Sequence, residues 1–204
     1  MEKEKYIADL AEIKKIMNRS SRFLSLSGMS GVIVGLIAIA GAYLAYAFIY
    51  TDQDYFSYRQ ANVSPSNVLK TVLLGGVLII SAAIVGLYFT QKKAEALGQQ
   101  LWGEQAKRFY SSLIIPLVTG GVFCLIMLLK GFVCFIAPAC LIFYGLALVN
   151  ASKYSLDTLK GLGLCEITLG LLSLYYIGYG LAFWVLGFGV LHIAYGLYMH
   201  IKYD

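Results

Sequence analysis

Six long apolar stretches, separated by short segments that hold nearly all the charged residues, dominate this sequence. They cover roughly residues 28–50, 68–90, 111–129, 131–150, 161–178 and 180–200. Each is close to the ~20 residues that an α-helix needs to cross a hydrocarbon core about 30 Å thick. Because every backbone N–H group inside lipid needs an internal hydrogen-bond partner, these stretches must be helical. The sequence therefore predicts an all-α, polytopic integral membrane protein with six transmembrane helices.

The composition excludes the main alternatives to this class. The 204 residues are 59% hydrophobic and only 13% charged, with a mean hydropathy of +0.74. Soluble domains carry about 25% charged residues, and disordered or nucleic-acid-binding chains carry more charge still. We therefore expect the lipid bilayer as the main partner, and no nucleic acid.

The division between the last two stretches is the least marked, because no charged residue separates them. A single helix over residues 162–199 would be roughly 57 Å long at 1.5 Å per residue, which is far longer than a membrane span. Gly178-Tyr179-Gly180 supplies a tight turn between the two stretches. Six spans are therefore predicted, and five are the alternative.

The basic residues predict the orientation of the chain. With six spans, 13 of the 16 Lys and Arg residues fall on one side of the membrane, and only Arg59, Lys70 and Lys130 fall on the other. Cytoplasmic segments carry the excess of Lys and Arg. Both termini are therefore expected in the cytoplasm, and the first span is expected to be retained rather than cleaved as a signal peptide.

The sequence divides into a cytoplasmic N-terminal helix, residues 1–24, and a six-helix transmembrane domain, residues 25–204. Tyr6, Leu10, Ile13 and Met17 form an apolar stripe at helical spacing within the first segment. Such a helix either lies on the lipid headgroups and the protein's own inner face, or docks a second copy or a partner protein. The stripe is too short to separate these alternatives.

A weak internal repeat favours an arrangement of the six spans as three hairpins. Residues 116–154 align without gaps on residues 165–203, pairing Gly121 with Gly170 and Lys153 with Lys202. Glycine-rich spans run from Gly161-Leu162-Gly163-Leu164 to Gly170 and from Gly187-Phe188-Gly189-Val190 to Gly196. In these features the chain resembles the HdeD-like small six-helix membrane proteins. The resemblance implies a bacterial inner-membrane location and a stress-related role, and it carries over no catalytic residue.

Glu166 is the one acidic residue deep inside a predicted span, and His192 is the one histidine well inside a span. A carboxylate in hydrocarbon is costly unless it is protonated, paired or hydrated. Glu166 lies roughly 9 Å from the inner boundary of its helix, and His192 lies roughly 12 Å from the same boundary on the next helix. The two side chains are therefore expected at similar depth.

Two interpretations of Glu166 and His192 stay open. In the functional one, they form a proton-sensitive pair that acts as a pH sensor or relay. In the structural one, the pair is hydrogen-bonded and fixes helix packing, or Glu166 bonds a Tyr or Ser hydroxyl group.

Glycines at helical spacing predict close contacts between helices. Gly163 and Gly170 flank Glu166, together with Ser173, while Gly189 and Gly196 flank His192. We expect these two stripes to face each other or the interior of the bundle. Gly31 and Gly35 form a G-x-x-x-G pattern, which is expected to serve an internal helix contact or, as the alternative, a dimer seam.

The four cysteines, Cys124, Cys134, Cys140 and Cys165, all lie in predicted spans and form no C-x-x-C motif. We interpret them as apolar packing residues. A disulfide between Cys124 and Cys134, which flank Lys130, is the redox alternative. No spacing of Cys and His resembles a metal site, so no metal and no cofactor are expected.

The sequence contains no catalytic motif such as H-E-x-x-H, G-x-S-x-G or a phosphate-binding loop. We therefore predict a non-enzymatic membrane protein with a sensing, regulatory or stress-related role, which responds to pH through Glu166 and His192. The alternative is a small proton- or ion-coupled transporter or channel that uses the same two residues.

Overall fold

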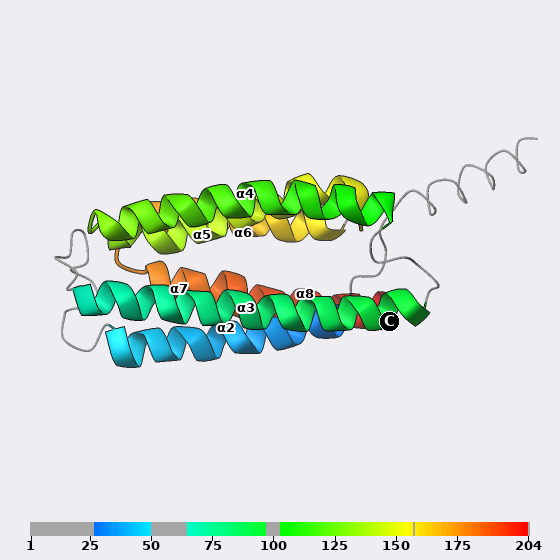
Figure 1. The fold of residues 1–204 in the computed structure, drawn as a ribbon, viewed down its shortest axis with the longest axis horizontal. Helices are drawn as coiled ribbons and strands as arrows, with labels where there is room; N and C mark the ends of the chain where they lie inside the picture. Colours follow the sequence, from blue (N-terminus) through cyan, green and yellow to red (C-terminus); the bar gives the residue numbers. More distant parts are fainter. Residues whose placement is uncertain (1–26, 50–64, 97–102, 157, 204) are drawn as a thin grey trace, which may run out of the picture.

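The computed structural model describes residues 27–49, 65–96, 103–156 and 158–203, and all regular secondary structure in these segments is helical (Figure 1). The predicted cytoplasmic helix over residues 1–24 lies outside the described residues. The longer helices are α2 (Gly28–Ile49), α3 (Pro65–Ala96), α4 (Glu104–Leu129), α5 (Ile136–Ala151), α6 (Thr158–Tyr175) and α8 (His192–Tyr203). Short helical segments complete the fold: η2 (Val133–Phe135), η3 (Ser152–Tyr154), α7 (Gly180–Trp184) and η4 (Val185–Leu191).

Five helical segments of the described chain are long and apolar enough to cross a membrane. They are Gly28–Ile49, Ser66–Ala96, Glu104–Leu129, Val133–Tyr154 and Gly180–Lys202. The last of them combines α7, η4 and α8 into one continuous span. Helix α6 is not among the five; it has 18 residues and includes Lys160 and Glu166.

Two helices are longer than the apolar stretches that predict them. Helix α3 continues past residue 90 to Ala96, and α4 begins at Glu104 instead of at residue 111. The added residues include Ala, Glu, Gln and Lys, which favour helix in water as well as in lipid. At 32 residues, α3 is about 48 Å long, so it extends well beyond a hydrocarbon core.

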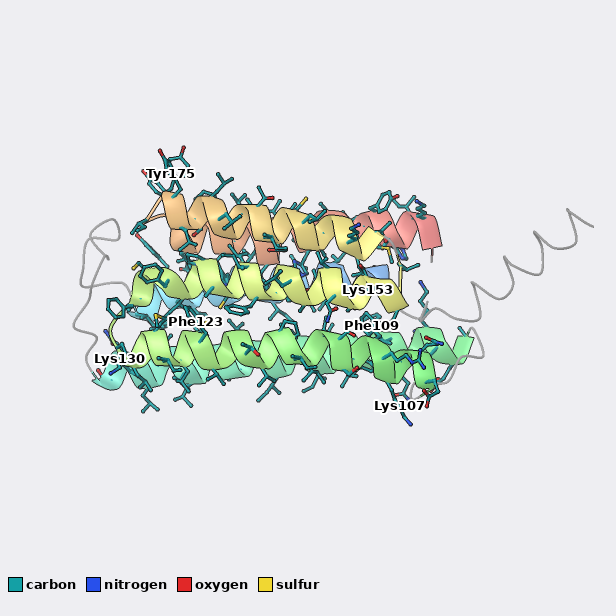
Figure 2. The ribbon with its side chains drawn as sticks, turned by 90° about the horizontal axis from the view of Figure 1, so that it is seen from above. Lys107, Phe109, Phe123, Lys130, Lys153 and Tyr175 are labelled. Atoms are coloured by element: carbon teal, nitrogen blue, oxygen red, sulfur yellow. The ribbon has the colours of Figure 1, made fainter. Side chains whose placement is uncertain are left out.

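The helices form two layers that lie one over the other. Helices α4, α5 and α6 make one layer, and α2, α3 and the segment from α7 to α8 make the other (Figures 1 and 2). Helix α5 packs against both α4 and α6, while α2 packs against both α3 and α8. Contacts between the layers run chiefly from α5 and α6 to α7 and η4.

Glycines allow the closest helix contacts within each layer. A Cβ atom on Gly31 would lie 3.1 Å from the Cα atom of Gly196, and one on Gly35 would lie 2.7 Å from the carbonyl oxygen of Gly189. These residues join α2 to the C-terminal span, so the G-x-x-x-G pattern makes an internal contact here.

The two glycine stripes expected to face each other or the interior of the bundle do not face each other but contact other helices of the bundle. A Cβ atom on Gly163 would lie 2.7 Å from the carbonyl oxygen of Gly145, and one on Gly170 would lie 3.0 Å from the backbone of Ile142. Both of these neighbours belong to α5, whereas Gly189 and Gly196 face α2. A helix has more than one face. The glycines near Glu166 and His192 therefore contact α5 and α2, whereas Glu166 and His192 contact each other.

The outer surface of the bundle is strongly apolar. Ile79 is 72% exposed, Ile115 is 67% exposed and Leu129 is 65% exposed. The buried residues include many small ones, such as Ala42 and Ala147. Large apolar side chains outside and small residues between helices indicate a membrane protein.

Tight turns connect the helices at one end of the bundle. The chain reverses after α4 at Gly131, with φ 80°, and after α6 at Gly178, with φ 109°, a region that favours glycine. No continuous helix therefore runs over residues 162–199. Lys130 and Tyr175 lie at this end, and Lys107 and Lys153 lie at the opposite end (Figure 2).

Candidate functional site

The structure brings Glu166 and His192 into contact where the two layers meet. The Oε1 atom of Glu166, near the middle of α6, lies 3.4 Å from the Nδ1 atom of His192, the first residue of α8. The Glu166 side chain is completely buried, and His192 is 5% exposed. The sequence predicts that Glu166 and His192 lie at similar depth. In the structure their side chains also approach each other directly.

A π-helix positions the imidazole ring. Segment η4 is a seven-residue π-helix that lies between α7 and α8 and ends just before His192. π-Helices are rare in proteins overall, but those that occur are often found at functional sites. The Nδ1–H group of His192 donates a 2.9 Å hydrogen bond to the carbonyl oxygen of Gly187, five residues earlier. The side chain thus satisfies a backbone carbonyl group of the turn that precedes it.

Helix α5 supplies a second partner for the ring. The hydroxyl group of Tyr144 lies 2.7 Å from the Nε2 atom of His192. Because Nδ1 donates to Gly187, the Nε2 atom of a neutral ring accepts a hydrogen bond from Tyr144. A tyrosine hydroxyl group can also accept, so Tyr144 remains a partner if Nε2 gains a proton.

Aromatic rings enclose the pair. The ring of Phe188 stacks on His192 with centroids 5.8 Å apart and an interplanar angle of 23°. Phe188 also lies 5.1 Å from Tyr144 and 5.0 Å from Trp184, measured between ring centroids. The rings of His192, Phe188 and Trp184 therefore lie in contact one after another.

The carboxyl group of Glu166 fits into a space that a glycine leaves. A Cβ atom on Gly187 would collide with Oε2 of Glu166 and with the side chain of Leu141. Within the described part of the chain, neither carboxyl oxygen has a hydrogen-bond partner. The 3.4 Å approach to Nδ1 makes no hydrogen bond, because the proton on Nδ1 points to Gly187.

This geometry makes the pair sensitive to the number of protons that it holds. With one exchangeable proton between them, Glu166 and His192 are neutral overall, whether the proton is on the carboxyl group or on the ring. Gaining or losing a proton leaves a net charge at a buried position, which is costly in low-dielectric surroundings.

Ser173 is a second buried polar group on α6 that has no hydrogen-bond partner in the described segments. It is 1% exposed, and its Oγ atom has no hydrogen-bond partner among the described residues. It follows Glu166 by seven residues, two helical turns or about 10 Å along the same face. The polar stripe that the sequence predicts therefore holds two unsatisfied side chains.

Neither Tyr144 nor the π-helix is predicted from the sequence. Tyr144 is one of 16 tyrosines, and nothing in its local sequence distinguishes it from the tyrosines expected at membrane interfaces. The glycines at 187 and 189 are the one local signal for η4, because they weaken a regular helix.

The cysteines are arranged differently from the redox alternative that the sequence suggested. All four are free thiols, and the sulfur atom of Cys124 lies 3.7 Å from that of Cys140. Helix α5 places Cys140 against α4, whereas Cys134 lies in the separate segment η2. Among the described residues, no three His, Cys, Asp or Glu side chains gather as metal ligands would.

Comparison of the chain with protein-family models, with curated proteins and with solved structures finds no match.

Proposed function

We propose that this chain is a non-enzymatic inner-membrane protein that responds to pH through Glu166 and His192. In this proposal, α6 also crosses the membrane and brings the number of spans to six, the spans form three hairpins as in the HdeD-like proteins, and both termini are cytoplasmic. Its 18 residues give α6 a length of about 27 Å, close to the thickness of a hydrocarbon core. A stress-related sensing role agrees with this architecture and with the lack of a catalytic motif.

The observation that carries the proposal is the buried carboxyl group 3.4 Å from a buried imidazole, with no hydrogen bond to either carboxyl oxygen in the described chain. A pair that served packing alone would be expected to satisfy its polar atoms. An unsatisfied carboxyl group beside a ring that already has two partners is instead suited to exchanging a proton.

The pair also has a means of passing its protonation state to the rest of the bundle. Glu166 belongs to α6, His192 to α8 and Tyr144 to α5, so both layers contribute to the cluster. A net charge on the pair would favour separation of the layers and entry of water, because water solvates the charge. The proposed response is therefore a change in the packing of α6 against η4 and α8.

Fluorescence of Trp184 provides the test, because its ring contacts Phe188, which stacks on His192. The experiment uses the full chain in lipid nanodiscs with Trp102→Phe, which leaves Trp184 as the one tryptophan. We expect a step in Trp184 emission on titration with acid or base. Glu166→Gln and His192→Gln should each remove or displace that step.

Matched controls are available on the exposed surface. Glu95→Gln and His200→Gln make the same chemical changes at exposed positions of α3 and α8 and should leave the titration unchanged. If Glu166→Gln and His192→Gln also retained the wild-type titration, the pair would have a structural role only.

The second candidate function is a small proton- or ion-coupled transporter or channel. Ser173 favours it, because two unsatisfied polar side chains on one buried face are typical of positions that water or an ion occupies. Proteoliposomes with an entrapped pH dye test for proton flux under an imposed membrane potential. Flux that is lost in Glu166→Gln and kept in Glu95→Gln would support transport, and no flux in the wild type would exclude a proton pathway.

A further inference from the structure

Cys124 and Cys140 lie in contact between helices α4 and α5. Their sulfur atoms are 3.7 Å apart, between the last two turns of α4 and the first two turns of α5. The thiol of Cys124 also lies 3.8 Å from the carbonyl oxygen of Ile136, one helical turn before Cys140. A disulfide needs an S–S distance of about 2.0 Å, and a rotation of the two side chains can supply the difference.

The two helices are held together on both sides of this contact, by the turn at Gly131 on one side and by two contacts on the other. On that second side, a Cβ atom on Gly120, one turn before Cys124, would lie 2.5 Å from the Cβ atom of Phe143. Farther along the same side, the side-chain amide of Asn150 donates a 3.0 Å hydrogen bond to the carbonyl oxygen of Ser112. The close approach of the thiols is therefore set by rigid helix packing.

The thiols lie beside apolar residues of the outer surface. Cys124 and Cys140 are partly exposed as residues, and the sequence neighbours Val122 and Leu125 on α4 are 53% and 44% exposed. Phe123, which precedes Cys124, lies nearer to Lys130 than to Lys107 (Figure 2). A reagent that reaches this pair has to be soluble in lipid.

We propose that Cys124 and Cys140 are a redox-active dithiol whose oxidant is a lipid-soluble quinone. The two S–H bonds break and one S–S bond forms, while two electrons and two protons pass to the quinone to give a quinol. The resulting disulfide links α4 covalently to α5. This step does not involve Glu166 or His192, so it stands or fails separately from the proposed pH response.

Peptide mapping tests the proposal on the full chain in nanodiscs that contain a short-chain ubiquinone. Trypsin cleaves after Arg108, Lys130 and Lys153, so Cys124 and Cys140 fall on different peptides, 109–130 and 131–153. After oxidation and alkylation without reductant, these peptides should remain joined, and fragmentation of the joined pair should place the bond at Cys140. One quinol should form per chain oxidised.

Cys134 lies on the same peptide as Cys140 and provides the matched control. Cys134→Ser should keep the joined peptides, whereas Cys124→Ser and Cys140→Ser should lose them completely. A disulfide bond that maps to Cys134 would overturn the proposal. Finding the two peptides separate after quinone treatment of the wild type would also overturn it, provided that all thiols of that sample react with the alkylating reagent in detergent. The mapping in the wild type decides the question even if a variant fails to fold.

Discussion

At the scale of single residues, the position of one carboxyl group depends on one glycine. Gly187 leaves the space that the Glu166 carboxyl group occupies, and its carbonyl oxygen accepts the hydrogen bond from His192. The same residue thus sets the position of both members of the pair. A single methyl group added at Gly187, as in alanine, would fill the space that the carboxyl group occupies.

We expect Gly187→Ala to destabilise the protein by about 1–3 kcal/mol, the usual cost of forcing a methyl group into a packed interior. The added Cβ atom would collide with Glu166 and Leu141. Unfolding in mixed micelles with increasing SDS measures the change in the free energy of unfolding. Gly161→Ala is the control, because a Cβ atom there has open space around it. Equal stability of the two variants would contradict the close packing at Gly187.

At the scale of elements, the π-helix η4 decides which way the end of the last span faces. A π-helix holds more residues per turn than an α-helix, so it changes the angular relation between α7 and α8. With η4 in place, Gly187 and Phe188 lie on the same side of the span as His192. A regular α-helix over the same residues would bring different side chains to the layer boundary.

Deleting one residue of η4 should therefore disconnect the site while the span itself remains helical. Val190 is the best residue to delete, because its side chain is 47% exposed. The deletion rotates Gly187 by about 100° relative to His192. We expect circular dichroism to show unchanged helix content and the pH step in Trp184 fluorescence to disappear. Val190→Ala keeps the register and should behave as the wild type does; a normal pH step in the deletion variant would show that η4 has no positioning role.

At the scale of the whole molecule, the number of spans depends on α6. The described chain has five helical segments that qualify by length and composition, and α6, whose 18 residues include Lys160 and Glu166, is not one of them. Yet α6 lies beside α5 over most of its length and shares its layer (Figure 1). If α6 crosses the membrane, its buried carboxyl group lies near mid-depth.

Labelling from one side of the membrane measures the topology directly. Single cysteines at Lys153, Tyr175 and Lys202 in a cysteine-free chain are treated with an impermeant maleimide in sealed vesicles. With six spans, positions 153 and 202 react from the same side and position 175 reacts from the other. Reaction of positions 153 and 202 from opposite sides would mean that α6 does not cross. Reaction of positions 153 and 202 both from the outside would reverse the proposed orientation.

Several local features of the fold follow from the sequence because they depend on local chemistry. Long apolar runs predicted the helical class, and Gly178 marked the turn that separates α6 from α7. Helix ends were predicted less well, since Ala, Glu and Lys extend α3 and α4 beyond the apolar residues. The partner of each glycine stripe could not be predicted, because periodicity defines a face and not the helix that packs on it.

By itself, the sequence determined that the chain folds as apolar helices and that Glu166 is out of place among them, because hydropathy and charge are properties of residues. Only the tertiary structure decided what surrounds Glu166. The packing of α5, α6, η4 and α8 brings Tyr144, Gly187 and His192 to one point and leaves the carboxyl oxygens unsatisfied. It also decided that Cys124 meets Cys140 and not Cys134. These contacts join residues far apart in the chain, and their distances depend on the angles and register at which whole helices pack.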